Sequence, residues 1–345
     1  MVSSVAKGVA KKEPPLIIIC TIILILVVLI SLNAGRYAVS LIDIWNIAIG
    51  NYDDNLLAFE KYTVFINLRL PRIIFAVCVG CALSVSGAVL QSLFRNPLAS
   101  PNIVGVMHGS NFGAALAISI FASYSTTSFV INAFSFIFGM LAIFIAYTLS
   151  MRSRDDSIAV IVLIGIVVSS VFQAGVSLIT YLADPYGVLP KITYRLMGSL
   201  QAATWKNIYL PVPLILISTL CIIIFSWRLN VMSLSDEEAL TLGVNIHKWR
   251  FIYLMLATLL VASAVAVCGN IMWIGLIVPH ITRQLVGADN KKLVPLTALM
   301  GSIFLVVIDT LVRSVTEGEV PVSIVTSFIG APFLGYLVLR DKRGG

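Results

Sequence analysis

Long apolar segments most constrain what this chain can fold into. A helix needs about 20 apolar residues to cross about 30 Å of hydrocarbon, and segments close to that length recur along the sequence. This length predicts about ten crossings, near residues 16–33, 70–94, 106–123, 129–150, 157–182, 208–227, 251–268, 274–286, 293–313 and 323–339.

The composition agrees with a protein that resides in a membrane. Hydrophobic residues make up 59% of the 345 residues and charged residues 11%, whereas soluble domains carry roughly 25% charge. No polar stretch is long enough to form a separate soluble domain. We therefore expect an all-α polytopic membrane protein with a single membrane-spanning domain over residues 1–345.

Two of the apolar segments differ from an ordinary crossing. The segment 16–33 follows several lysines, but its apolar core is longer than that of a secretory signal, so it is predicted to be a retained first helix. The segment 274–286 is short and contains Pro279, His280 and Arg283. It is predicted to be a short or broken crossing, and broken helices at membrane depth tend to line cavities.

The placement of basic residues predicts the orientation. With residues 1–15 as a cytoplasmic tail and 228–250 as a cytoplasmic loop, most of the 23 lysines and arginines lie on the inner side, as the positive-inside rule requires. Both termini are then cytoplasmic. The net charge of +7 is explained by this bias towards the inner leaflet and requires no nucleic acid.

A faint internal similarity is compatible with an inverted repeat. Helices two and seven run in opposite senses, and such repeats place the pathway of many transporters at their interface. The first set of matched residues is Ala82, Val85, Gly87, Pro97 and Gly105, and the second is Ala264, Val267, Gly269, Pro279 and Gly287.

Two arginines stand at the expected entrance of the second crossing, in Arg69-Leu70-Pro71-Arg72. A charge at this depth must be explained by water, a partner or a ligand, because hydrocarbon offers a guanidinium nothing to bind. This motif indicates transport.

The longest polar stretch on the inner side covers residues 233–244. Ser235 followed by Glu238 predicts a capping box at the start of a short helix, and Gly243 can end that helix. A short capped helix outside the bilayer is typical of a docking element. An ordinary solvated loop is the alternative that the pattern leaves open.

Five stretches together resemble the FecCD or BtuC-like family, the permease subunits of binding-protein-dependent ABC importers for iron-siderophores, haem and cobalamin. The resemblance extends from about residue 32 to 339. The stretches are Arg69-Leu70-Pro71-Arg72 with Gly80 and Ser86-Gly87; 91–101 with Gly105; Met197-Gly198-Ser199-Leu200 before Trp205; 233–244; and 275–280 with Asp309, Arg313, Glu319, Pro321 and 330–332. Arg195 departs from the pattern, because an aromatic residue is frequent there.

The resemblance implies roles for two sets of residues. In this family the loop between helices six and seven contacts the ATP-hydrolysing subunits, and arginines on the outer face meet acidic side chains of the binding protein. The implied docking residues are Arg69, Arg72 and Arg313, which we expect to be exposed rim charges whose loss weakens docking without unfolding. The implied coupling residues are Ser235, Asp236, Glu237, Glu238, Ala239, Leu242 and Gly243.

Polar residues within the fifth and tenth crossings are candidates for the pathway, which in this family is associated with these two helices and runs between two permease copies. They are Ser169, Gln173, Ser177, Ser323, Thr326 and Ser327. The alternative is hydrogen bonding between helices, worth about 0.6 kcal/mol on average.

The sequence contains no Walker lysine loop, zinc-protease motif or nucleophile elbow, so we expect no enzymatic activity and no cofactor, with ATP used by separate ABC ATPase subunits. The expected function is import of a ferric siderophore across a bacterial cell membrane. The expected partners are a binding protein and a second permease copy or paralogue. Haem and cobalamin remain alternatives within the family; an ion-coupled secondary transporter and a non-transporting scaffold are alternatives outside it.

Overall fold

The fold is all-helical wherever it is described. The computed structural model of the chain describes residues 16–35, 37, 39–50, 56–121, 128–153, 158–315 and 318–341. Within these ranges every regular element is a helix, seven are long and apolar enough to cross a membrane, and three shorter apolar helices accompany them. The prediction of an all-α polytopic membrane protein is confirmed. The predicted tail 1–15 and the last four residues lie outside the described ranges.

Each predicted crossing corresponds to one helix or, for residues 208–227, to two consecutive helices. Apolar segments become helical in a bilayer because a helix satisfies its backbone hydrogen bonds internally. The helices of the crossings are α1 (Leu16–Asn33), α4 (Leu70–Leu93), α5 (Val106–Ile120), α6 (Ser128–Ser150), α7 (Ile158–Leu182), α10 (Pro211–Ile224) with α11 (Ser226–Met232), α13 (Ile246–Cys268), α14 (Ile274–Val286), α15 (Asn290–Val315) and α16 (Val322–Asp341). The short elements are α2 (Leu41–Ala48), α3 (Leu56–Tyr62), the π-helical η1 (Thr63–Arg69), the 3₁₀ turn η2 (Pro101–Val104), α8 (Val188–Leu196), α9 (Trp205–Ile208) and α12 (Asp236–Thr241).

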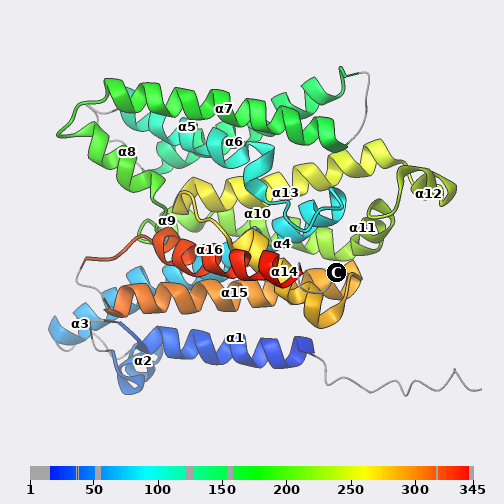
Figure 1. Ribbon diagram of the computed structural model, residues 1–345. Coiled ribbons are helices and arrows are strands. Elements are labelled where there is room, and N and C mark those ends of the chain that lie inside the picture. Colours follow the sequence, from blue (N-terminus) through cyan, green and yellow to red (C-terminus); the bar gives the residue numbers. More distant parts are fainter. Residues whose placement is uncertain are drawn as a thin grey trace, which may run out of the picture.

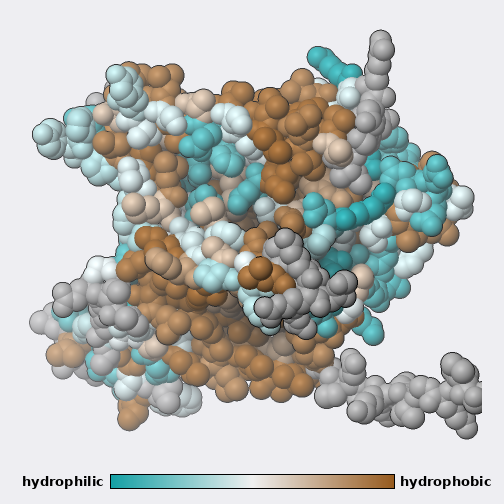
Figure 2. Space-filling view, in the orientation of Figure 1, coloured by the Kyte–Doolittle hydropathy of each residue, from teal (hydrophilic) through white to brown (hydrophobic). Residues whose placement is uncertain are grey.

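The long helices lie roughly side by side, with α1 at one edge and α7 at the opposite edge (Figure 1). Helix α4 lies in the interior, where α13, α14 and α15 pack around it, and nearly all of its side chains are buried. By contrast, α1 buries only Cys20 and Ser31. Figure 2 shows extended apolar surface, mainly in the lower half of this view, and hydrophilic residues at both ends. Hydrophilic and neutral residues also lie in the middle of this face.

Two helices refine the sequence prediction. The second crossing is longer than expected, because α3, η1 and α4 form one continuous apolar helix over Leu57–Leu93. Arg69 and Arg72 therefore lie within a continuous helix and not at its entrance. The eighth segment is short, as predicted, but α14 continues unbroken through Pro279.

Helices approach closest where glycines face each other. A Cβ atom placed on Gly87 of α4 would lie 1.7 Å from the carbonyl oxygen of Gly275 in α14, and one on Gly80 would lie 2.2 Å from that of Gly301. Small residues permit this approach between membrane helices. The inverted repeat stays a prediction: Gly87 and its counterpart Gly269 make different contacts, since Gly269 packs against the carbonyl of Arg195.

The Gly87 contact yields a stability prediction. We expect Gly87→Ala to lower the melting temperature strongly, because the obstacle is backbone that cannot rotate away and overpacking costs ~1–3 kcal/mol or more. Gly335→Ala in α16 is the matched control, because a Cβ there meets nothing within 4 Å. Thermal unfolding of the two purified variants measures the difference, and equal melting temperatures would contradict the prediction.

Candidate functional site

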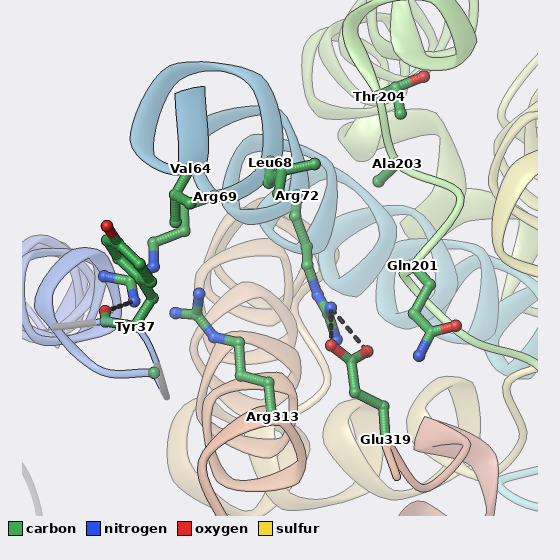
Figure 3. A pocket seen from close by; sticks show the side chains of 11 residues that line it. Tyr37, Val64, Leu68, Arg69, Arg72, Gln201, Ala203, Thr204, Arg313 and Glu319 are labelled. Carbon is green, nitrogen blue, oxygen red and sulfur yellow. Dashed lines mark hydrogen bonds and ion pairs between the residues drawn. The ribbon is translucent and has the colours of Figure 1, made fainter. Parts of the chain in front are cut away.

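Three arginines from separate elements meet around one cavity at the end of the molecule that carries α2 and α3. Arg69 ends η1, Arg72 lies in the first turn of α4, and Arg313 lies near the end of α15. The cavity has a volume of about 260 Å³ and is lined also by Tyr37 and Glu319 (Figure 3). We call Arg69, Arg72 and Arg313 the arginine cluster.

Arg72 is held by two carboxylates. Its Nη2 donates to Asp309 at 2.7 Å and its Nε at 2.9 Å, while Nη1 donates to Glu319 at 2.8 Å. Asp309 is fully buried and also lies 3.9 Å from Nε of Arg313. This network joins α4, α15 and the loop before α16.

The other two arginines hold the end of α1. Arg69 donates to the carbonyls of Leu32 at 2.9 Å and of Tyr37, and Arg313 donates to the carbonyl and the hydroxyl of Ser31. Arginine is well suited to this, since the last carbonyls of a helix lack partners within the helix and carry partial negative charge.

The expectation of exposed rim charges is therefore wrong for the arginine cluster. Arg69, Arg72 and Arg313 are only 5%, 8% and 7% exposed. Buried guanidiniums are stable only with partners, and here those partners lie within the chain. The arginine cluster thus holds these elements together at this end of the molecule. Only the sides of the arginines that line the cavity can contact another molecule.

At the opposite end of the molecule, α12 has the predicted local structure (Figure 1). The hydroxyl of Ser235 accepts from the Glu238 backbone N–H at 3.2 Å, and the Glu238 carboxylate accepts from the Ser235 N–H at 3.0 Å. Gly243 adopts a φ of +71°, and Val244 N–H donates to the carbonyl of Ala239, closing a Schellman motif. The predicted capping box and glycine stop are confirmed.

Ion pairs fix α12 to the rest of the protein. Asp236 contacts Arg95 at 2.5 Å, just after α4, and Arg250 in α13 at 3.0 Å. Partial burial opposes ionisation of Asp236, but the hydrogen bonds from both arginines outweigh it, and the pKa of this carboxyl is lowered. Asp236 therefore stays ionised and connects α12 to two long helices.

The remaining side chains of this loop divide into an inner and an outer set. Ala239 is buried against the body, while Glu237, Glu238 and Gly243 are exposed. Leu240 and Leu242 are apolar side chains within an otherwise polar segment, yet they are 63% and 56% exposed. These two leucines are the apolar side chains that α12 and its C-cap present to a partner.

A family model now identifies this architecture: the model of the FecCD transport family matches residues 23–340. The chain belongs to the FecCD transport family. It is the permease component of an ABC importer, a multi-pass membrane protein that works with an ATPase made as a separate subunit and with a substrate-binding protein.

Relatives of this FecCD permease are named for different cargoes. The chain is 40% identical to the molybdate import permease MolB of Haemophilus influenzae, over 96% of this chain and 97% of the relative. It is 37% identical to the hemin permease HmuU of Yersinia pestis, over 93% and 94%. It also matches a structure assigned to the metal-chelate type of ABC transporter, in an inward-facing conformation, with a TM-score of 0.85 and 36% identity over 95% and 100%.

In this FecCD permease, α7 carries two exposed stripes. Ser170, Gln173 and Ser177 follow each other at helical spacing and are exposed, so they form a polar stripe. The neighbouring exposed stripe is apolar and contains Leu163, Val167, Ala174, Leu178 and Tyr181. The two stripes have different chemistry and suit different surroundings.

The other candidate pathway residues are less exposed. Ser169 is buried and donates to the carbonyl of Gly165, and Thr326 is buried and donates to the carbonyl of Ser323. Ser323 and Ser327 are partly exposed at the beginning of α16, where Ser323 donates to the carbonyl of Met197. Gln173 and Ser177 are thus the two candidates with the most accessible side chains.

Several contacts in this permease could not be read from local pattern. Arg195, which departs from the family pattern, donates to the carbonyls of Ala266 and Val267 and so caps the end of α13. Gly198, at a φ of +73°, lies directly against the carbonyl of Asn270. In the sequence, only the place of Gly198 in the Met197 to Leu200 motif indicated this close contact. Nothing in the sequence pattern indicated that Asp236 pairs with Arg95 and Arg250.

Proposed function

We propose that this FecCD permease imports a ferric siderophore across a bacterial cell membrane, driven by ATP hydrolysis on partner subunits and with both termini cytoplasmic. The observation that carries the proposal is the character of the exposed polar stripe on α7, whose Ser170, Gln173 and Ser177 bear no charge. A neutral hydroxyl and amide lining suits a bulky chelate whose metal charge is already balanced by its own ligand oxygens.

Delivery takes place at the arginine cluster. An acidic side chain of the substrate-binding protein enters the cavity beside Arg69 and Arg313, with Glu319 already bound to Arg72. Charge complementarity of this kind sets encounter rate and register more than affinity. Because the cluster also closes the fold, docking uses guanidiniums that are already held in place.

Energy enters at α12. Leu240 and Leu242 insert into the ATPase subunit, and the ion pairs of Asp236 pass its movement to the ends of α4 and α13. A short helix with both ends capped is stiff enough to transmit such a displacement.

The pathway forms between two permease copies, or between this chain and a paralogue, with Gln173 and Ser177 facing it from α7 and Ser323 and Ser327 from α16. Ser169 and Thr326 support the lining from behind. The adjacent apolar stripe of α7 then faces lipid or the second copy.

The buried Asp309 argues against an ion-coupled secondary transporter. The sequence has this one acidic residue deep in a predicted crossing, and proton-coupled transport uses such a residue as a carrier. In the structure both of its oxygens are held by Arg72, so the carboxylate serves the fold.

Molybdate is the second candidate cargo, because MolB is among the most similar relatives. An oxyanion differs from a siderophore in needing positive charge or many N–H donors along its route. The stripe on α7 offers neither, which favours the chelate.

Reconstitution in proteoliposomes with the ATPase subunits and the binding protein tests the proposal. We expect ATP-dependent uptake of labelled ferric siderophore that excess molybdate, haem and cobalamin do not suppress. Uptake that continues without the ATPase subunits would refute the mechanism. Suppression by molybdate, with molybdate uptake in its place, would instead refute only the cargo.

A further inference from the structure

A second cavity, unrelated to the arginine cluster, lies between α6 and α10. Both helices pack on α13, which forms the floor of a groove of about 220 Å³. Its walls are mainly apolar and include Phe136 and Ile137 of α6 and Leu214 of α10. An apolar cavity of roughly 150 Å³ can hold a benzene ring, so this groove has room for part of an alkyl chain.

The floor of the groove carries a hydroxyl without a partner. Ser263 of α13 is 1% exposed, and its Oγ makes no hydrogen bond within the described structure. A buried donor without a hydrogen-bond partner lowers stability by about 1–3 kcal/mol. Membrane hydrocarbon cannot supply the missing acceptor. Ser263 lines the groove, but its Oγ is almost fully covered. Rotation of the side chain to another staggered rotamer, towards the groove, would let a molecule lying there accept the hydrogen bond.

The end of the groove is positively charged. Lys206 of α9 lines it, is exposed, and forms no ion pair within the described residues. No acidic side chain is among the described residues that line the groove. Tyr209, which is largely exposed, also lines the groove, and such aromatic residues mark the level of lipid headgroups.

The groups that line the groove are of the kinds that the parts of a phospholipid bind. Ser263 precedes the end of α13 by five residues, which places it ~7.5 Å deeper than that end. A lipid phosphate beside Lys206 has its ester carbonyls below it and its acyl chains deeper still. The groove offers an ammonium, a hydroxyl-bearing side chain and an apolar wall to these three parts.

We propose that this groove is a binding site for an anionic phospholipid of the leaflet on the α9 side. Lys206 binds the phosphate, Ser263 Oγ donates to an ester carbonyl, and an acyl chain fills the space between Phe136 and Leu214. The lipid holds α6 and α10 at a fixed separation on α13. This role is independent of the cargo and of the transport mechanism.

Lipid binding to the purified full-length chain tests the site. Native mass spectrometry and thermal unfolding are followed while phosphatidylglycerol or phosphatidylcholine with the same acyl chains is added back. We expect one phosphatidylglycerol per chain to be retained preferentially and to raise the melting temperature. Lys206→Gln should weaken phosphatidylglycerol binding about fivefold and should weaken phosphatidylcholine binding less, because the choline group already balances the charge of that phosphate.

Two further variants separate this site from general adhesion of lipid. Lys191→Gln removes a lysine of α8, which is exposed and does not line the groove, and should have no effect. Ser263→Ala should weaken ester-linked phosphatidylglycerol about fivefold but leave an ether-linked analogue unchanged. Equal binding of both headgroups by the native chain, equal effects of the two lysine variants, or an unchanged ester lipid in Ser263→Ala would each overturn the proposal.

Discussion

Arg72→Met is expected to unfold most of the permease, although the residue lies near the membrane surface. The substitution leaves the Asp309 carboxylate buried with only the distant Arg313 Nε, and removes the ion-pair partner of Glu319. Removing one member of a buried ion pair costs about 3–5 kcal/mol. The measurement is the melting temperature and the monodisperse yield of the purified chain.

A compensating variant shows whether the charge is the cause. Arg72→Met combined with Asp309→Asn removes both charges of the Arg72–Asp309 pair, so we expect it to recover most of the lost stability. Lys191→Met, on the exposed surface of α8, should behave like the native chain. If Arg72→Met is as stable as Lys191→Met, the network is not what holds this end together.

Loss of the exposed Leu240 in α12 and of Leu242 at its C-cap is expected to stop transport without disturbing the fold. Leu240→Asp with Leu242→Asp places two charges where we propose that the ATPase subunit binds, and buried interface positions of this kind cost about 2 kcal/mol or more each. We expect copurification of the ATPase subunit and ATP-driven uptake to fall at least about tenfold, since each ~1.4 kcal/mol is tenfold in binding.

Controls for α12 come from the same positions. Leu240→Met with Leu242→Met conserves volume and apolar character and should keep uptake close to native. The melting temperature of the aspartate variant should stay near the native value, because both side chains are exposed. Undiminished uptake by the aspartate variant would remove α12 from the coupling mechanism while leaving the family assignment intact.

Much of the fold could be predicted from the sequence because its determinants are local. The apolar helices at the ten predicted segments follow from segment length and apolar character, and Ser235, Glu238 and Gly243 define the ends of α12 through contacts a few residues apart. The extension of the second crossing back to Leu57 was missed, because it contains the polar and charged residues Glu60, Lys61 and Asn67.

The site was less predictable, because its contacts join residues far apart in the sequence. The motif Arg69 to Arg72 identified the right residues and the right end of the molecule, but it gave no information on their partners. Arg72 binds Asp309 across 237 positions and Glu319 across 247. Arg313 reaches Ser31 across 282.

By itself, the sequence determined that this protein crosses the membrane many times, which segments cross, and where a capped helix projects, since hydrocarbon thickness and helix capping act on neighbouring residues. Only the tertiary structure decided which charges are free. An arginine beside a bilayer looks the same in sequence whether it meets a partner protein or a carboxylate of its own chain. The packing of α1, α4 and α15 buried the arginine cluster and left Leu240, Leu242 and Lys206 exposed.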